Sequence, residues 1–321
     1  MINFSFDSRM TATDAAYFKN VTAQSIHKEL FTKNLLSKKN NNRVYFGHET
    51  ARKIFNLNFN KKIISFQIVK GGTGKTSIAH SFAVRANLYG ARVLCIDLDQ
   101  QGNLTEAFGI DSNHTPIMID IINQPELINS SLMNIAPGLD ILPSRIENAV
   151  LDNHLMLNKH PLDRVYKHIL EKVSSNYDLI FIDCPPALGQ SVTAAALTSD
   201  IIVFPVTPEQ FSLSGLEISF REINTLNKRF GSACKFKILL NKFDMRTALS
   251  RDILTKMITH NTFKELMCET LIRSCQDFPN MIYSLTNIFS NTKSSFAKED
   301  IDLFTKEILE LKIKNKKNAL N

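Results

Sequence analysis

Three glycines, two lysines, two threonines and a serine fall within eight residues, because the chain reads KGGTGKTS from residue 70 to residue 77. Glycines let backbone N–H groups approach an anion closely, and the N-terminus of a following helix adds positive potential. In such a loop we expect Lys75 to reach the β- and γ-phosphates of a nucleotide and the Thr76 hydroxyl to hold Mg²⁺. A glycine-rich turn that binds nothing is the disfavoured alternative. The residues predicted to contact the nucleotide are Lys70, Gly71, Gly72, Thr73, Gly74, Lys75, Thr76 and Ser77.

The flanking residues predict a strand before this loop and a helix after it. Residues 63–69 are apolar and rich in β-branched side chains, which is typical of a buried strand. Residues 78–90 keep helical spacing and end at Gly90, a common helix stop. A strand, a glycine-rich loop and a helix in this order form a phosphate site.

Two further predicted strands carry carboxylates at their ends. The strand within 91–99 ends in Asp97 and Asp99, and the strand within 176–186 runs into Asp183. Ligands of open α/β sheets gather at the carboxyl ends of the strands, so these groups should lie near the loop. An aspartate at the end of such a strand holds Mg²⁺ in P-loop NTPases. Candidate metal residues are therefore Thr76, Asp183 and Asp99, although an isolated D-x-D could also cap a loop.

The loop resembles the deviant Walker A loop of the ParA/MinD family of ATPases, because Val69 stands where the generic first glycine would be and Lys70 begins the motif. Residues 97–103 and 183–186 are similar to the family's D-x-D-P-Q-G-N and D-x-P-P elements, with Gln100 in place of the first proline. The resemblance implies a slow Mg²⁺-dependent ATPase that forms a nucleotide sandwich dimer. It also implies three catalytic residues: Lys75, Asp99 to position the attacking water, and Lys70 acting across the dimer.

Later segments match the family more loosely. Pro208 falls where a loop of relatives passes near adenine, and Asn241 falls where some relatives touch the base. Arg246 matches an arginine implied to contact nonspecific DNA, with a surface ion pair as the open alternative. Arg273 also falls on an arginine position, but Ile272 replaces the proline that precedes it in relatives. A last strand is expected at 269–273 and an amphipathic helix near the C-terminus.

The first sixty residues are a basic segment that precedes the predicted nucleotide domain. Residues 1–62 hold eleven Lys or Arg and four Asp or Glu, so they account for the whole net charge of +7. Such a segment indicates nucleic acid or another anionic surface, and a solvated flexible arm is the alternative. Its predicted helices and short strand resemble the helix-turn-helix or MerR-like modules that precede larger plasmid-type ParA domains. Residues predicted to contact DNA phosphates are Lys38, Lys39, Arg43, Arg52 and Lys53.

The predicted fold is α/β: a P-loop NTPase-like twisted, mainly parallel sheet with helices on both faces, preceded by a small, mainly α module. We place the basic module at 1–60 and the ATPase domain at 61–321. Five scattered cysteines without a C-x-x-C pair indicate neither a zinc site nor a disulfide framework. No apolar run is long enough to span a bilayer, and the N-terminus lacks the layout of a signal peptide. A cytoplasmic, nucleoid-associated protein is therefore expected.

These features predict a DNA-partition ATPase with ATP and Mg²⁺ as cofactors. Its ATP-bound homodimer would bind DNA, and a ParB-like centromere-binding partner would stimulate hydrolysis. The basic module suggests operator binding and autoregulation. One alternative is a MinD-like positioning ATPase that meets membranes through the basic C-terminal tail at Lys312, Lys314, Lys316 and Lys317. Another is a transcription regulator that only senses ATP.

Overall fold

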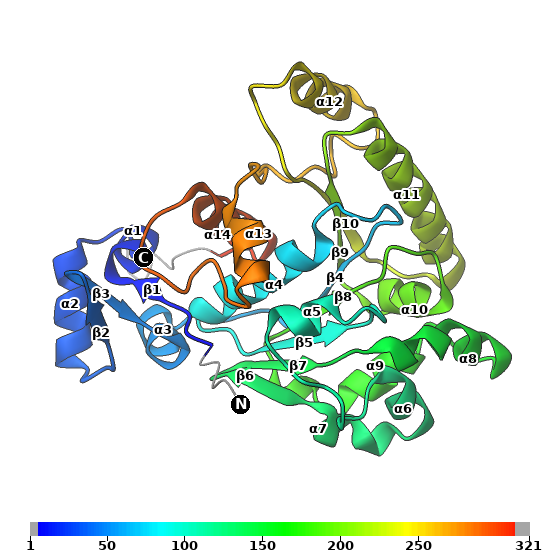
Figure 1. Cartoon of the computed structure of the whole chain (residues 1–321), viewed down its shortest axis with the longest axis horizontal. Helices are drawn as coiled ribbons and strands as arrows, with labels where there is room; N and C mark the ends of the chain where they lie inside the picture. Colours follow the sequence, from blue (N-terminus) through cyan, green and yellow to red (C-terminus); the bar gives the residue numbers. More distant parts are fainter. Residues whose placement is uncertain (1–5, 312–321) are drawn as a thin grey trace, which may run out of the picture.

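A seven-stranded sheet in the order β10-β9-β4-β8-β5-β7-β6 organises the chain (Figure 1). The computed structural model describes residues 6–311. Every neighbouring pair is parallel except β6 with β7, so the predicted mainly parallel sheet is confirmed. The strands are β4 (Lys62–Phe66), β5 (Val93–Asp97), β6 (Met133–Ala136), β7 (Leu139–Leu142), β8 (Leu179–Asp183), β9 (Ile201–Val206) and β10 (Lys235–Leu240).

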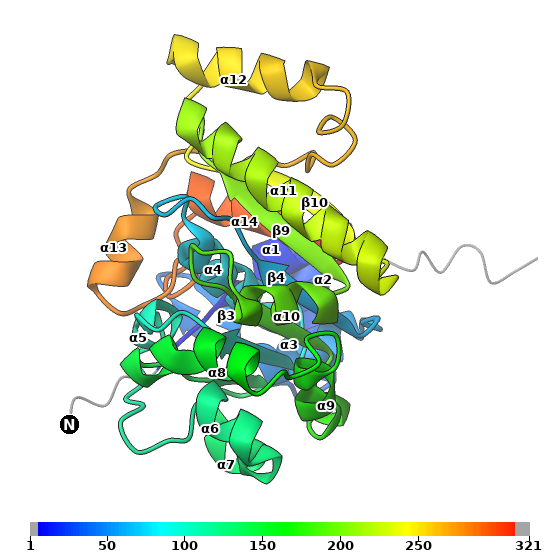
Figure 2. The ribbon, with the colours of Figure 1, turned by 90° about the vertical axis from the view of Figure 1, so that its right-hand side faces the viewer.

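Helices cover both faces of this sheet because alternate residues of its central strands point in opposite directions. Val93 and Cys95 of β5 pack in the cluster that contains α4, whereas Leu94 and Ile96 pack against α9 and α10. Beyond β10, α11 and α12 stack at one edge of the sheet (Figure 2). The helices of this part are α4 (Lys75–Leu88), α5 (Asn103–Ala107), α6 (Met118–Asn123), α7 (Ile128–Ser131), α8 (Leu151–Leu157), α9 (Val165–Glu171), α10 (Gln190–Thr198), α11 (Gln210–Phe230), α12 (Ala248–Thr259), α13 (Asp277–Tyr283) and α14 (Phe296–Ile308).

The N-terminal module combines helices with a small antiparallel sheet, so it is less helical than the sequence predicted. Its elements are β1 (Met10–Thr11), α1 (Ala12–Lys19), α2 (Ala23–Thr32), β2 (Lys38–Asn40), β3 (Arg43–Phe46) and α3 (His48–Phe55). The strands pair in the order β1-β3-β2. Asn41 and Asn42 both adopt positive φ, at 46° and 62°, which suits the tight turn of the β2–β3 hairpin. The Thr22 hydroxyl caps the start of helix α2 by accepting the backbone N–H of Ser25.

The module shares its hydrophobic core with the nucleotide domain. Ala15, Ile26 and Phe46 of the module belong to the same buried cluster as Phe82 of α4 and Phe304 of α14. At the centre of the boundary, the Tyr89 ring packs against Phe18 and Phe55, with centroids 4.7 and 5.4 Å away. Because the apolar contacts run without a break, removal of residues 1–60 would expose the core of the nucleotide domain.

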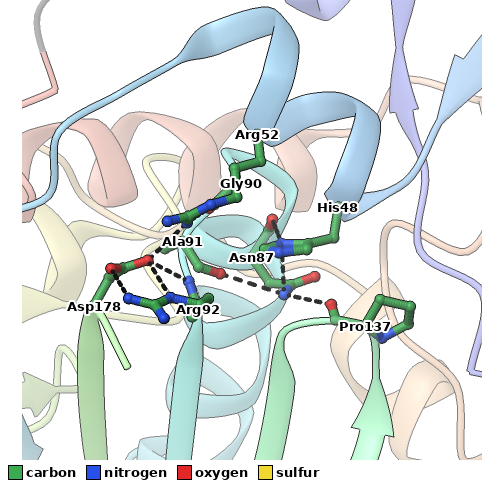
Figure 3. Close-up of polar contacts among 8 residues, drawn as sticks. All are labelled: His48, Arg52, Asn87, Gly90, Ala91, Arg92, Pro137 and Asp178. Atoms are coloured by element: carbon green, nitrogen blue, oxygen red, sulfur yellow. Dashed lines mark hydrogen bonds and ion pairs between the residues drawn. The ribbon is translucent and has the colours of Figure 1, made fainter. Parts of the chain in front are cut away.

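A polar network closes the same boundary (Figure 3). The Arg52 guanidinium donates to the Gly90 carbonyl at 2.6 Å and to Asp178 at 2.8 Å. Arg92 donates to the same carboxylate from its backbone and its side chain, at 2.9 and 3.0 Å. Burial alone would raise the pKa of Asp178, but the hydrogen bonds from the two arginines outweigh it and hold that pKa below its usual value. Nearby, His48 Nδ1 lies 3.0 Å from the Asn87 carbonyl oxygen.

Residues 269–273 do not form the regular strand expected from the sequence. Isolated bridges join this region to its neighbours, between Ile238 and Met267 and between Phe243 and Arg273, and the Ile272 backbone N–H donates to the Leu240 carbonyl at 2.8 Å. The backbone N–H groups of Glu269 and Thr270 instead donate to the Glu307 carboxylate of α14, at 2.8 and 2.9 Å. A carboxylate of α14 therefore takes two of the backbone donors of this stretch.

The C-terminal helix is present as α14, and the Ser295 hydroxyl caps its start. The helix is amphipathic, as predicted, and buries Ile301, Phe304 and Ile308 in the core. The basic tail proposed for membrane contact lies at residues 312–321, outside the described residues. Within residues 6–311, every helix is too short or too polar to cross a bilayer.

We expect Gly90→Ala to lower the free energy of unfolding by about 3 kcal/mol, because two costs add at this position. Gly90 has φ +93°, and an added Cβ would lie 2.6 Å from the Arg52 Cα. Gly109→Ala is the matched control, since Gly109 has φ +68° with no atom within 4 Å of the added Cβ. Denaturant unfolding measures both variants, and equal losses would contradict the close approach of the module.

Candidate nucleotide site

The glycine-rich loop lies between β4 and α4, at the carboxyl edge of the sheet, as the sequence predicted. Gly72 and Gly74 adopt positive φ, at 75° and 88°, a backbone region that L side chains rarely occupy. An added Cβ on Gly74 would lie 2.3 Å from Asn241 Nδ2, so the loop also needs glycine for close packing. Helix α4 then begins at Lys75 with no side chain capping its first N–H groups, which leaves them for an anion.

Lys75 is buried at the base of the loop, with 7% of its surface exposed. Burial lowers the pKa of its ammonium, while the nearby carboxylates of Asp183 and Asp99 work in the opposite direction. A buried cation beside the free N–H groups of a helix start is suited to binding a polyphosphate.

Asp183 ends β8, and its carboxylate accepts the Thr76 hydroxyl at 2.7 Å. Burial raises the pKa of Asp183 to about 8, and the neighbouring Asp97 adds to that shift. Its Oδ1 atom is buried and has no hydrogen-bond partner. An unsatisfied carboxylate oxygen beside a hydroxyl fits a hard cation such as Mg²⁺, which prefers oxygen ligands.

The described residues contain no cluster of three or more His, Cys, Asp or Glu that could hold a metal by themselves. A cation at Thr76 and Asp183 would therefore complete its shell with water and phosphate oxygens. That arrangement is typical of Mg²⁺ bound with a nucleotide, which usually keeps several waters.

The two aspartates that end the region of β5 have different surroundings. Asp97 lies beside Asp183 on the neighbouring strand and accepts the backbone N–H and the hydroxyl of Thr105, at 2.9 and 2.8 Å. Burial raises the pKa of Asp97 to about 7 in spite of these bonds. The Asp99 carboxylate accepts the backbone N–H of Gln101 at 3.0 Å. Hydrogen bonds from Thr105 therefore occupy the Asp97 carboxylate. The Asp99 carboxylate accepts fewer hydrogen bonds and is the better placed of the two to act on a ligand.

Lys70 points to a different place from Lys75. Its ammonium lies 3.8 Å from the Glu209 carboxylate and 5.6 Å from the centre of the Phe211 ring, both at the start of α11. Gly215 of α11 permits this approach, because an added Cβ there would lie 3.1 Å from the Lys70 Cβ. One third of the Lys70 side chain remains exposed, at 33%. The two lysines of the motif therefore have separate positions.

The residues predicted to lie near the base come from the ends of β9 and β10. Pro208 follows β9 and is half-buried. Asn241 follows β10, is buried, and donates from Nδ2 to the Thr73 carbonyl at 2.7 Å. Sequence reasoning missed Lys242, whose ammonium donates to the Gly72 carbonyl at 2.9 Å. The sequence signal that could have identified Lys242 is its position directly after Asn241.

Some of the residues predicted to contact DNA are exposed, and others are engaged in contacts within the chain. Lys38, Lys39 and Lys53 are exposed. Arg43 is exposed as well, but it donates to the Thr292 carbonyl. Arg246 has 90% of its side chain exposed while it pairs with Asp244 at 2.8 Å, the ion pair that the sequence left open.

Arg52 and Arg273, also predicted to contact DNA, are engaged in contacts within the chain. Arg52 is engaged at the module boundary with Gly90 and Asp178. Arg273 donates to Asp300 at 2.6 Å and lies 4.0 Å from the centre of the Phe296 ring. Both guanidinium groups hold parts of the chain together, which the sequence did not reveal because their partners are distant in it.

The chain is similar in sequence to known proteins. A family model described as an AAA domain matches residues 61–238. A ParA family protein of Mycoplasma pneumoniae is 31% identical over 276 residues, covering 78% of this chain and 97% of that protein. The sporulation initiation inhibitor protein Soj of Bacillus subtilis is 31% identical over 217 residues, covering 66% of this chain and 83% of Soj.

A solved structure has the same fold. It is a Borrelia burgdorferi protein described as a plasmid partition protein and bound to AMPPNP. The TM-score is 0.63 at 22% identity, and the match covers 78% of this chain and 99% of that one.

We expect Thr76→Ala to lower the gain in nucleotide affinity that Mg²⁺ provides by tenfold or more, because the variant removes a predicted metal ligand and the partner of Asp183. Affinity measured in EDTA should change little. Ser77→Ala is the matched control at the next residue and should keep its response to Mg²⁺. Titration of a fluorescent nucleotide with and without Mg²⁺ gives the result, and a Thr76→Ala protein that gains as much affinity from Mg²⁺ as the wild type would remove Thr76 from the metal site.

Proposed function

Because this chain belongs to the ParA family of P-loop ATPases, we propose that it is a DNA-partition ATPase that uses ATP and Mg²⁺ and acts as a dimer. The glycine-rich loop with Lys75 would hold the triphosphate, and Thr76 with Asp183 would hold the metal. Mg²⁺, when bound, would supply charge neutralisation at the β- and γ-phosphates. The solved Borrelia burgdorferi structure with AMPPNP supports the assignment of an adenine nucleotide.

The observation that carries this proposal is the separation of the two lysines. Lys75 is buried in its own loop, whereas Lys70 reaches Glu209 at the surface and stays partly exposed. Hydrolysis of a phosphoanhydride is accelerated when a second positive charge reaches the transferring phosphoryl group. Lys70 is placed to supply that charge to a second copy of the chain when two copies meet around ATP. A dimer of this kind would be assembled by ATP and released after hydrolysis.

Asp99 would orient the water that attacks the γ-phosphorus. The bond from that phosphorus to the oxygen shared with the β-phosphate then breaks, which gives ADP and inorganic phosphate, and the water's proton leaves to solvent. Asp99 is 6% exposed, and its carboxylate is close enough to Lys75 to act on the pKa of that lysine. Asp97 is less suited because Thr105 occupies its carboxylate.

The N-terminal module would bind DNA, with α2 and the β2–β3 hairpin as the contact surface. Lys28 on α2 and Lys38 and Lys39 on β2 are all exposed and basic. A helix pair followed by a hairpin can place one helix in a major groove while hairpin cations contact phosphates. A specific operator and autoregulation would follow from this surface, and a ParB-like protein is the proposed partner that stimulates hydrolysis.

A MinD-like role on membranes has less support, because it would depend on a tail outside the described residues. A measurement of ATP turnover separates our proposal from a regulator that senses ATP without hydrolysing it. Such a regulator would bind ATP and DNA but release no phosphate.

Lys70→Ala should keep the affinity of the monomer for ATP while turnover falls by about 10²-fold or more, since the charge that it supplies acts only in the dimer. Lys75→Ala should instead weaken ATP binding itself. Phosphate release and nucleotide titration, run side by side, separate the two effects. Normal hydrolysis by Lys70→Ala would rule out the action of this lysine across the dimer.

Duplex DNA should be retained more strongly with ATP than with ADP, and the Lys38→Glu/Lys39→Glu double variant should lose that retention by tenfold or more. The change acts through phosphate contacts, so the salt dependence of binding should also become shallower. The matched control is Lys167→Glu/Lys172→Glu, which makes the same charge change at exposed residues at and just beyond α9. Fluorescence anisotropy at two salt concentrations is the measurement. Equal losses in both double variants would show a general charge effect and contradict a binding surface on the module.

A further inference from the structure

The loop that follows β8, residues 184–189, is held at both of its ends. It begins directly after Asp183, the proposed metal ligand. It ends where α10 begins, and there the Asp152 carboxylate of α8 accepts the backbone N–H of Ser191 at 2.7 Å. Gly189, the residue before α10, has no side chain that could bond to the first N–H groups of the helix. Asp152 therefore supplies from a neighbouring helix the oxygen that an N-cap residue usually supplies.

The contact between Asp152 and Gly189 is too close for a larger residue. A Cβ added to Gly189 would lie 1.9 Å from Asp152 Oδ2. The φ of Gly189 is −146°, in the β region that any residue adopts, so the backbone alone does not require glycine here. The approach of the carboxylate is what requires it. A negative charge also suits this position, because the N-terminus of a helix carries partial positive charge.

Helix α8 is fixed in place by its packing against α10. Leu151 and Leu155 of α8 are buried in the same cluster as Val192 and Ala195 of α10 (Figure 2). Closely packed core side chains leave an element little freedom to shift by itself. The start of α10 is therefore positioned by α8, and Asp152 is the polar contact between the two helices at that point.

Hydrogen bonds also connect α8 to the end of β5. The Thr105 hydroxyl, which donates to Asp97, accepts the Ser144 backbone N–H at 2.9 Å. The Ser144 hydroxyl accepts from Asn148 Nδ2 at 2.8 Å. Asn148 lies in a 3-10 helix (Ile146–Val150) that runs directly into α8. The strand ends that carry the carboxylates of the site are therefore joined through α8 by contacts that need no nucleotide.

We propose that Asp152 is a positioning residue for ATP hydrolysis, because it sets where residues 184–189 lie at the end of the triphosphate. These residues leave β8 at Asp183, and Asp183 with Asp99 marks the place of the metal and of the terminal phosphate. The Asp152 carboxylate is occupied by α10, so it acts through the helix and takes no part in the bond-breaking step. ADP has no terminal phosphate, and its binding does not depend on this loop. The inference rests on the proposed hydrolysis of ATP.

The test is a double-mutant cycle on the contact between Asp152 and Gly189. Asp152→Ala removes the oxygens that accept the Ser191 N–H, and Gly189→Ala displaces them with its Cβ. Asp152→Asn keeps one acceptor oxygen in a side chain of the same shape. Asn153→Ala, at the next and exposed residue of α8, is the matched control. Phosphate release gives kcat and KM for ATP, competition with a fluorescent nucleotide gives the dissociation constant of ADP, and denaturant unfolding shows whether each variant folds.

We expect Asp152→Ala and Gly189→Ala each to lower kcat about tenfold, since a small misplacement at the reacting group is enough for such a loss. The dissociation constant of ADP should stay within about twofold. The double variant should lose no more than either single variant, because the Cβ of residue 189 has no carboxylate to displace once Asp152 is replaced by alanine. Asp152→Asn should recover most of the lost kcat, because its amide oxygen still accepts the Ser191 N–H. Asn153→Ala should keep the kcat of the wild type.

Wild-type kcat in a folded Asp152→Ala protein would overturn the inference, and if that variant does not fold, wild-type kcat in Gly189→Ala would do the same. An equal loss of ADP affinity would also overturn it, because Asp152 would then only support the fold. Losses that add in the double variant would show that the two residues act separately. A wild-type protein that releases no phosphate from ATP would instead overturn the proposed function, and this inference with it.

Discussion

One buried lysine faces three buried carboxylates at the carboxyl edge of the sheet, and this imbalance of charge governs the site. Burial raises the pKa of Asp183 to about 8 and that of Asp97 to about 7, and a neighbouring carboxylate adds to each shift, while Lys75 lowers the pKa of Asp183 only in part. The unpaired Oδ1 of Asp183 belongs to the same imbalance. Buried charge without a partner is costly, and proteins retain it where a ligand completes the arrangement. A magnesium nucleotide would bring the missing cation and, through its phosphates, a partner for Lys75.

Helix α4 connects this site to the rest of the molecule. Its first residue is Lys75, and its far end carries Asn87, Tyr89 and Gly90 into the boundary with the N-terminal module (Figure 3). Along its length, Arg85 is buried and pairs with Asp302 of α14. Nearly every side chain of α4 is buried, so the helix has little freedom to move without its neighbours. The nucleotide site and the module are thus attached to opposite ends of one packed helix.

The sequence predicted those parts of the structure that are determined by residues close together in the chain. The loop, the strand before it and the helix after it follow from local spacing, and so do the caps at Thr22 and Gly90. Residues 103–138 gave no clear pattern, and the structure shows why: α5, α6 and α7 are each one or two turns long, too short for a periodic signal. The ion pairs of Arg52 with Asp178 and of Arg273 with Asp300 were not predictable for a related reason, because only the fold brings these residues together.

The shared core has a consequence for how the chain acquires its structure during synthesis. The module precedes the nucleotide domain in the chain, yet residues that follow most of that domain complete its surroundings, because the Phe289 carbonyl accepts the Arg9 backbone N–H and the Lys306 ammonium lies 5.3 Å from the centre of the Tyr17 ring. Domains that each have their own hydrophobic core fold one by one as they leave the ribosome. Here the nascent N-terminal segment keeps apolar surface open until α14 emerges. Until then the apolar side chains of the module lack the partners that cover them in the folded chain, so the folding of α1 depends on the synthesis of α14.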